Sequence, residues 1–276
     1  ILTYTFLVFY TVTILSIVLV IITDNRNPLK TLPWIIVLVF APVVGLVFYF
    51  FFGQNLSKRR IISRRTRRRI TMQLEEARDT GRPEIPEEHR RLAALLYSTT
   101  HSVALYGSRI TPYTDGRSKM EALLAEIARA KHHIHIQYYI FCDDETGRRL
   151  RDALVEKVRQ GVEVRILYDD VGCSGVKKDF FEGMRREGIE VFSFLHVKFP
   201  LFTSKVNYRN HRKIAVIDGR VGFIGGMNVA DRYVRGTGWG SWRDTHFRIE
   251  GSGAAGLQVS FLSDWSATTK QHITGA

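Results

Sequence analysis

Cysteine is scarce in this chain, and its scarcity excludes two kinds of architecture. Only Cys142 and Cys173 occur among 276 residues, and neither lies in a CxxC pair or beside a Cys/His cluster. A disulfide scaffold and a structural zinc site both need such patterns, so neither is expected. We interpret the two residues as ordinary thiols in a reducing compartment.

Charged residues are missing from two long N-terminal runs. Residues 2–22 and 33–52 contain no Asp, Glu, Lys or Arg. About 20 apolar residues in a helix cross a bilayer core, so a transmembrane hairpin is predicted over residues 1–55, with spans at about 2–22 and 33–52. Pro28 is expected to break the helix in the linker, and Pro33 to begin the second span. A cleaved signal peptide is disfavoured, because the first run is long, has no basic start and precedes a second run.

A dense basic cluster follows the second run. Eight residues account for most of the formal net charge of +13, namely Lys58, Arg59, Arg60, Arg64, Arg65, Arg67, Arg68 and Arg69. The positive-inside rule places residues 56–88, a basic juxtamembrane segment and linker, on the cytoplasmic side with the domain that follows. The cluster is either a topology signal alone or also a binding surface for anionic lipid headgroups. Nucleic acid is not an expected partner, because the cluster adjoins a membrane span.

Strand and helix patterns alternate from about residue 89 to residue 276. Runs rich in β-branched residues predict strands, and apolar residues at helical spacing predict helices between them. The expected strands are 109–113, 133–140, 162–168 and 189–194, and the expected helices are 119–130, 148–160 and 177–187. This order predicts an α/β domain with a mixed, mostly parallel sheet between helices. Its ligand site is expected beyond the carboxyl ends of the strands.

Two acidic pairs, Asp143-Asp144 and Asp169-Asp170, follow strands of this predicted sheet. Paired carboxylates bind metal ions in some proteins, but more often they form turns and cap helices. We favour turns and caps for both pairs.

The segment NHRKIAVIDGRVGFIGGMN, residues 210–228, has an unusual spacing of polar residues. His211 and Lys213 are two positions apart, so on a strand they face the same side, and Arg212 faces the other. Asp218-Gly219 predicts the turn of a hairpin, with a return strand after it.

The same segment supplies the groups that a phosphodiester site requires. An imidazole such as that of His211 acts as a nucleophile or general acid near neutral pH. The Lys213 ammonium neutralises a phosphate oxygen, while the N–H of Gly226 and the amide of Asn228 hold the others. A lone His-x-Lys is usually two solvent-facing residues, so the prediction depends on the full spacing. Such a site needs no metal and no cofactor, and we expect neither.

The complete spacing is His-x-Lys, four residues, Asp, six residues, then Gly-Gly-x-Asn, and it resembles the HKD motif of the phospholipase D superfamily. The two apolar runs, the basic cluster and the segments YRNHRKIAVIDG, GFIGGMNVADRY and WRDTHFRIEG are similar to bacterial cardiolipin synthases. The resemblance implies a phospholipase D-like domain in a multi-pass protein of the bacterial cell (inner) membrane.

The resemblance also implies a reaction. One phosphatidylglycerol gives its phosphatidyl group to His211 and releases glycerol, and a second phosphatidylglycerol takes the group to form cardiolipin. Lys213 binds the phosphate with support from Asn228, and Asp218 holds the geometry of the motif. The competing interpretations are a hydrolase that uses water as acceptor and a catalytically silent membrane protein that gathers anionic lipid.

The superfamily brings two HKD motifs to one active site, whereas this sequence contains a single HxKxxxxD. Either a second motif lies beyond Ala276, or two copies of the chain pair and each contributes His211. The resemblance favours the first arrangement. Residues 89–276 would then be the first phospholipase D-like domain of a longer enzyme, inactive by themselves.

Overall fold

The computed structural model describes residues 2–23, 28–41, 44–45, 48–49, 85–100, 102–194, 209–271 and 273. The chain divides into two units, one drawn from residues 1–59 and 197–208 and one from residues 60–196 and 209–276. The basic cluster at residues 58–69 lies outside the described residues.

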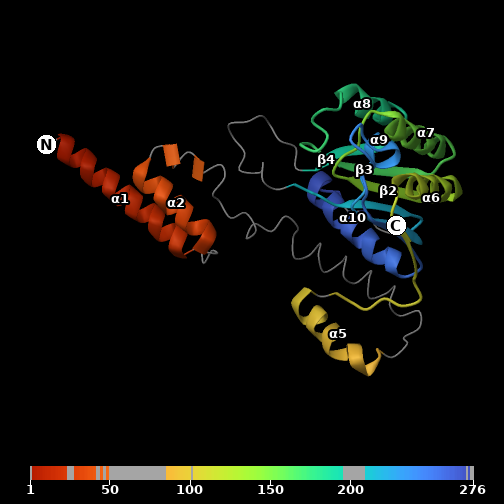
Figure 1. Ribbon diagram of the computed structural model, residues 1–276, viewed down its shortest axis with the longest axis horizontal. Coiled ribbons are helices and arrows are strands. Elements are labelled where there is room, and N and C mark those ends of the chain that lie inside the picture. Colours follow the sequence, from red (N-terminus) through yellow and green to blue (C-terminus); the bar gives the residue numbers. More distant parts are fainter. Residues whose placement is uncertain are drawn as a thin grey trace. The chain divides into compact units, whose positions relative to one another are not determined.

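Two helices account for most of the described N-terminal residues (Figure 1). α1 spans Leu2–Thr23 and α2 spans Pro28–Phe40. Pro28 therefore begins the second helix instead of breaking it, and Pro33 lies inside, which corrects the predicted start. Proline fits the first turn of a helix, where its missing N–H removes no hydrogen bond. Among the described residues, no helix combines the length and the hydropathy that a bilayer crossing needs.

The described residues of the second unit form a seven-stranded sheet in the order β1-β7-β6-β5-β2-β3-β4. The strands are β1 Arg109–Tyr113, β2 His133–Tyr138, β3 Glu163–Asp169, β4 Glu190–Phe194, β5 Lys213–Ile217, β6 Val221–Gly225 and β7 His246–Glu250. The helices are α5 Glu87–Thr100, α6 Gly116–Arg129, α7 Glu145–Arg159, α8 Lys178–Arg186, α9 Asp231–Arg235 and α10 Gly253–Thr269. Every strand and helix expected between residues 109 and 194 is present, whereas the sequence patterns do not predict α5, α9 or β7.

The sheet is mixed, as predicted, but it is not mostly parallel. Among the described strands, the β2–β3 and β3–β4 pairs are parallel and the other four pairs are antiparallel. The helical crossovers through α7 and α8 return the chain to the same end of the sheet, which produces the parallel pairs. The β5–β6 hairpin instead reverses at Asp218 and Gly219, both with positive φ (50° and 64°). The β2–β5, β6–β7 and β1–β7 pairs are antiparallel as well, although longer stretches of chain separate their strands.

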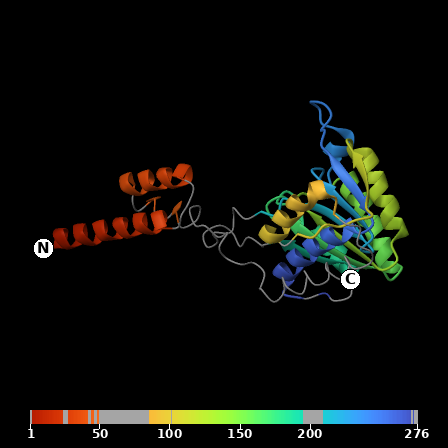
Figure 2. The same cartoon turned by 90° about the horizontal axis from the view of Figure 1, so that it is seen from below.

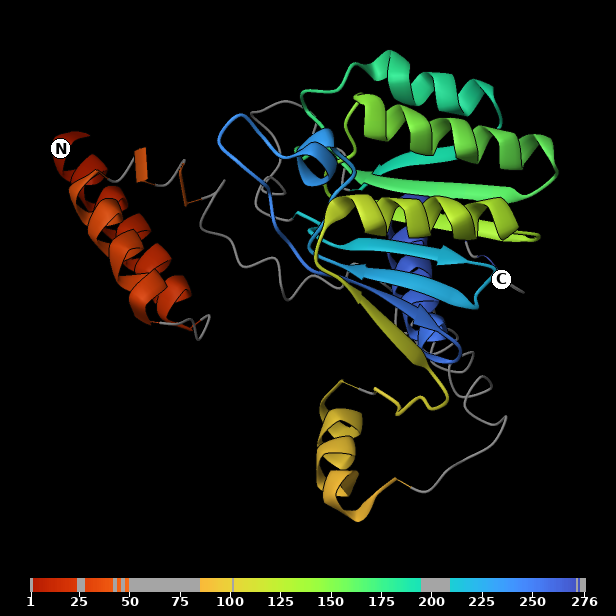
Figure 3. The same cartoon turned by 45° about the vertical axis from the view of Figure 1, so that its right-hand side comes forward.

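Helices cover both faces of this sheet, with α6, α7 and α8 on one face and α10 on the other (Figures 1, 2 and 3). Alternating side chains of strand β2 point to opposite faces of the sheet. Ile134, Ile136 and Tyr138 belong to the large core shared with α6, α7 and α8. His133 and His135 lie on the α10 side, where both contact Gln258, at 3.2 and 3.1 Å.

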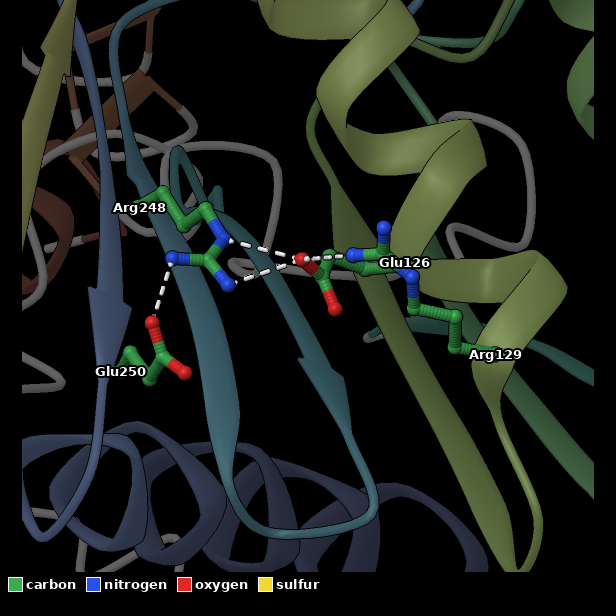
Figure 4. Close-up of polar contacts among 4 residues, drawn as sticks. All are labelled: Glu126, Arg129, Arg248 and Glu250. Carbon is green, nitrogen blue, oxygen red and sulfur yellow. Dashed lines mark hydrogen bonds and ion pairs between the residues drawn. The ribbon is translucent and has the colours of Figure 1, made fainter.

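A charged cluster joins α6 to β7 (Figure 4). Arg248 donates from Nε and Nη2 to one oxygen of Glu126, at 3.1 and 2.8 Å, and from Nη1 to Glu250 at 2.9 Å. Arg129 adds a contact of 3.3 Å to the same Glu126 oxygen. Since Glu126 is buried, loss of its carboxylate would leave a poorly solvated guanidinium on β7. The cluster therefore stabilises β7, which begins two residues after Asp244.

Candidate active site

The predicted motif lies at the edge of the sheet where β2 and β3 end. Strand β5 runs antiparallel to β2, and its first residue, Lys213, pairs with Tyr138, the last residue of β2. His211 lies just before β5 at the same edge. The carboxyl ends of parallel strands are where α/β sheets bind ligands. The motif therefore lies at the edge of the sheet where the sequence predicts a ligand site.

His211 and Lys213 contact each other directly. Nζ of Lys213 lies 3.0 Å from Nδ1 of His211 and donates to the His211 carbonyl oxygen at 2.7 Å. The Lys213 side chain is buried, whereas His211 is exposed. Arg212, between them, contacts Asp264 of α10 on the opposite face of the sheet. The imidazole and the ammonium thus share one side, and the guanidinium takes the other, as the alternation predicts.

Tyr139 packs against this pair. Its ring centroid lies 4.5 Å from that of His211, with the two planes inclined by 51°, and 5.2 Å from Nζ of Lys213. An aromatic face attracts a nearby cation and packs against a neighbouring ring. Because Tyr139 directly follows β2, the pairing of β2 with β5 brings it to the site.

The surroundings lower the pKa of both groups. Partial desolvation of the imidazole, and then the charge of Lys213, lower the pKa of His211, while Asp169 and Asp244 oppose the shift. Burial lowers the pKa of Lys213 to about 8, and Asp244 again opposes it. Near neutral pH the imidazole is therefore neutral and the ammonium charged. A neutral imidazole beside a fixed cation is suited to attack on an anionic phosphodiester.

Gly226 makes room for Asp244. A Cβ atom at Gly226 would lie 1.9 Å from Oδ1 of Asp244. The Gly226 N–H donates to the carbonyl oxygen of Thr245 at 2.8 Å. This bond engages the N–H that was expected to hold a phosphate oxygen. The missing side chain instead lets the Asp244 carboxylate approach, and this carboxylate acts on both His211 and Lys213.

Asn228 is also engaged within the protein. Its Oδ1 accepts from the N–H of Ile140 at 3.0 Å, and its Nδ2 donates to the Tyr233 hydroxyl at 2.8 Å. The side chain is buried, and its bonds join the segment after β2 to α9. The contacts give Asn228 a supporting role, and they leave just one amide hydrogen for the phosphate contact expected from the sequence.

Asp218 lies at the far end of β5 from His211. Its carboxylate accepts from the backbone N–H groups of Lys131, His132 and His133, at 2.9, 2.8 and 3.0 Å. Burial raises the pKa of this carboxyl, but the three donors outweigh burial and the net pKa is lowered. The bonds join the hairpin turn to the start of β2. This geometry supports the structural role that the resemblance implies for Asp218.

The acidic pairs form caps and turns, as predicted. Asp144 accepts from the N–H of Gly147 at 3.0 Å and caps α7. Asp169 accepts from two N–H groups of the loop that follows it, and also from the N–H of Asn210 at 3.1 Å. The last bond ties the end of β3 to the residue before His211.

Three residues of the site are not identified by the sequence patterns, namely Tyr139, Asp169 and Asp244. Tyr139 follows a strand and Asp169 ends one at the edge of the sheet, so their position at strand ends was a usable signal. Asp244 lies in the segment WRDTHFRIEG, where no local pattern shows that β7 will pair with β6.

Two family models match the chain. Residues 123–239 match the family described as cardiolipin synthase, PLD-like domain. Residues 9–54 match the family described as phospholipase D-nuclease N-terminal. With the mixed α/β sheet and the contact between His211 and Lys213 at its edge, these matches place the chain in the phospholipase D superfamily.

Curated relatives narrow this assignment. The major cardiolipin synthase ClsA of Bacillus subtilis is 36% identical over 274 residues, which cover 96% of this chain and 57% of the relative. A cardiolipin synthase of Alkalihalophilus pseudofirmus is 38% identical over 275 residues, which cover 96% of this chain and 54% of the relative. The chain is a homologue of the bacterial cardiolipin synthases, and it spans just over half the length of these relatives. Among solved structures, NucT from Helicobacter pylori aligns with a TM-score of 0.47 at 16% identity, over 59% of this chain and 98% of that one.

Proposed function

We propose that this chain provides one half of the active site of a cardiolipin synthase. The enzyme transfers a phosphatidyl group from one phosphatidylglycerol to another, which yields cardiolipin and glycerol. The observation that supports the proposal most directly is the contact between His211 and Lys213 at the ligand-binding edge of the sheet. The homology to proteins named cardiolipin synthase supports the choice of substrate.

The transfer proceeds through two displacements at phosphorus. In the first, the neutral imidazole of His211 attacks, the N–P bond forms, and the P–O bond to glycerol breaks while a general acid protonates glycerol. In the second displacement, a hydroxyl of another phosphatidylglycerol attacks phosphorus and the N–P bond breaks. The proton of that hydroxyl passes to the general acid that gave up its own proton in the first step. Lys213 neutralises the phosphate oxygens in both steps.

The general acid is a second histidine in the opposite protonation state. A second HKD domain of the same protein supplies it in the arrangement that we favour, because the relatives are almost twice as long as this chain. In the alternative arrangement two copies of the chain pair, and each contributes its His211.

The substrate places the enzyme at a membrane, and we assign the attachment to residues 1–55 as a transmembrane hairpin of a bacterial inner membrane. The 22-residue α1 contains no charged residue, which supports this assignment. The basic cluster at 58–69 favours a cytoplasmic catalytic domain and contact with anionic lipid, not nucleic acid. With the catalytic domain in the cytoplasm, the linker between the two spans lies on the outer side of the membrane, and a cysteine placed at residue 25 tests this orientation. Labelling of that cysteine in intact cells by an impermeant maleimide supports the orientation, and labelling only after lysis contradicts it.

The decisive experiment supplies labelled phosphatidylglycerol to the complete natural protein in membranes. Cardiolipin and glycerol in equal amounts are the expected products. Phosphatidic acid would indicate hydrolysis, and absence of turnover would contradict the proposal. His211→Ala is expected to lose all turnover, whereas His89→Ala, at an exposed position on α5, should retain it. Turnover by His211→Ala would remove this residue from the mechanism.

A further inference from the structure

One carboxylate on the opposite face of the sheet holds the residues on either side of His211. Oδ2 of Asp264 accepts from Nε2 of Gln137 at 2.8 Å and from Nδ2 of Asn210 at 2.7 Å. The same oxygen accepts from the Arg212 guanidinium. Two of the three donors are therefore the sequence neighbours of His211.

The backbone around His211 is held as well. Oδ1 of Asn210 accepts from the N–H of Arg212 at 3.2 Å, which closes a turn around His211. The N–H of Asn210 donates to Asp169 at 3.1 Å. Asn210 is thus hydrogen-bonded to two buried carboxylates, those of Asp169 and Asp264, and also to the backbone on the other side of His211. These bonds fix a segment that lies outside β5.

The packing of α10 keeps Asp264 in place. Phe261 and Trp265 flank it on the helix, are fully buried and pack with Leu167 of β3. His135 of β2 stacks on Phe261, with ring centroids 4.4 Å apart. A group on a packed helix positions its partners more accurately than a group on a loop.

We propose that Asp264 is a positioning residue for the phosphatidyl transfer. It sets the orientation of the His211 imidazole through Asn210 and Arg212, and it does not touch the substrate. The inference depends on the proposed function, because it requires a reaction at His211. A displacement of a reacting atom by about 1 Å costs on the order of 100-fold in rate. Loss of the anchor should therefore act on kcat and leave phosphate binding by Lys213 intact.

Asp264→Asn in the complete protein tests the inference. Asparagine keeps the size of the side chain, but it cannot pair a charge with Arg212. The kcat of transfer is expected to fall about 10- to 100-fold, with KM changed by less than about twofold. Asp152→Asn makes the same substitution at an exposed position on α7 and should keep the wild-type kcat. Wild-type kcat in a folded Asp264→Asn protein would overturn the inference.

Arg212→Gln provides a second test that does not depend on the folding of Asp264→Asn, because the Arg212 side chain is 51% exposed. Its kcat should also fall. The double variant should lose no more than Asp264→Asn alone, because both changes act through one contact. Additive losses, or wild-type kcat in Arg212→Gln, would contradict the inference. A merely structural Asp264 would lower the Tm and leave kcat per folded molecule unchanged.

The two proposals fail in different ways. A wild-type protein that makes no cardiolipin rejects the proposed function, and the role of Asp264 with it. An active wild type together with a fully active, folded Asp264→Asn protein rejects the positioning role alone.

Discussion

Nζ of Lys213 lies 3.0 Å from Nδ1 of His211, and its charge helps to keep the imidazole neutral. Burial lowers the pKa of Lys213 to about 8. The two groups that this chain supplies therefore set two limits: the His211 imidazole must be neutral, which fails in acid, and the Lys213 ammonium must be charged, which fails above about pH 8.

Asp244→Asn is expected to move both limits to lower pH. The Asp244 carboxylate raises the pKa of His211 and of Lys213, so its removal lowers both. The pH dependence of kcat/KM reports the pKa values of the free enzyme. Measured over roughly pH 5 to 9, both limbs of the profile should shift in the acid direction. Activity on the alkaline side should fall, because Lys213 then loses its proton at lower pH.

The exposed Asp152→Asn variant is the matched control for this profile, since it removes one carboxylate on α7. Its two limbs should coincide with those of the wild type. A profile of Asp244→Asn in which one limb stays fixed, or in which either moves toward alkaline pH, would show that Asp244 does not act on both groups.

Gly226→Ala is expected to reduce activity although Gly226 offers no free N–H to a substrate. The new Cβ would lie 1.9 Å from Oδ1 and 2.4 Å from Cγ of Asp244, so the carboxylate must move. Overpacking of this kind costs about 1–3 kcal/mol of stability, and displacement of the site costs on the order of 100-fold in kcat/KM. Transfer assays and thermal unfolding of the same preparation measure both effects. Gly175→Ala, which would meet no atom within 4 Å, should leave both unchanged. Full activity in Gly226→Ala would show that Asp244 need not lie where it does.

Strands, turns and contacts that depend on residues close together in the sequence could be predicted. β1 spans Arg109–Tyr113, the predicted bounds, because Thr114-Asp115-Gly116 marks a turn directly after it. Asp115 then caps α6 by accepting from the N–H of Ser118 at 2.8 Å. The β5–β6 hairpin and the contact of His211 with Lys213 likewise depend on residues a few positions apart.

Features set by distant residues could not be predicted in this way. The close approach at Gly226 exists because β7 pairs with β6, and Gly225 lies opposite His246 in that pair. The short sequence of β7 alternates polar and apolar residues after a glycine-rich loop, which gives no sign of the strand with which it pairs. α5 has no buried residue, and its apolar residues, among them Leu92 and Leu95, are exposed, so they do not mark a core-facing side of a helix. The anchor Asp264 is 52 residues from Arg212, beyond any local pattern.

Asp218→Asn is expected to lower stability and leave the chemistry at His211 nearly unchanged. Three backbone N–H groups donate to the Asp218 carboxylate, and asparagine loses its charge although it tolerates the φ of 50°. Hydrogen bonds to a charged group contribute about 1.5–3 kcal/mol, so a loss on this order is expected near neutral pH. Thermal unfolding of the detergent-solubilised protein measures it, and kcat per folded molecule should stay close to that of the wild type.

The pH dependence of this loss identifies its cause. The folded pKa of Asp218 is lowered from the ordinary value of 3.8. A lowered carboxyl pKa adds stability that is fully present above the unfolded pKa and disappears as the pH falls through the folded one. The difference in Tm between the wild type and Asp218→Asn should therefore be largest near neutral pH and shrink below about pH 4. A difference that stays constant or grows toward acid would mean that the charged carboxylate is not what holds the turn to β2, and the exposed Asp152→Asn variant should show no difference at either pH.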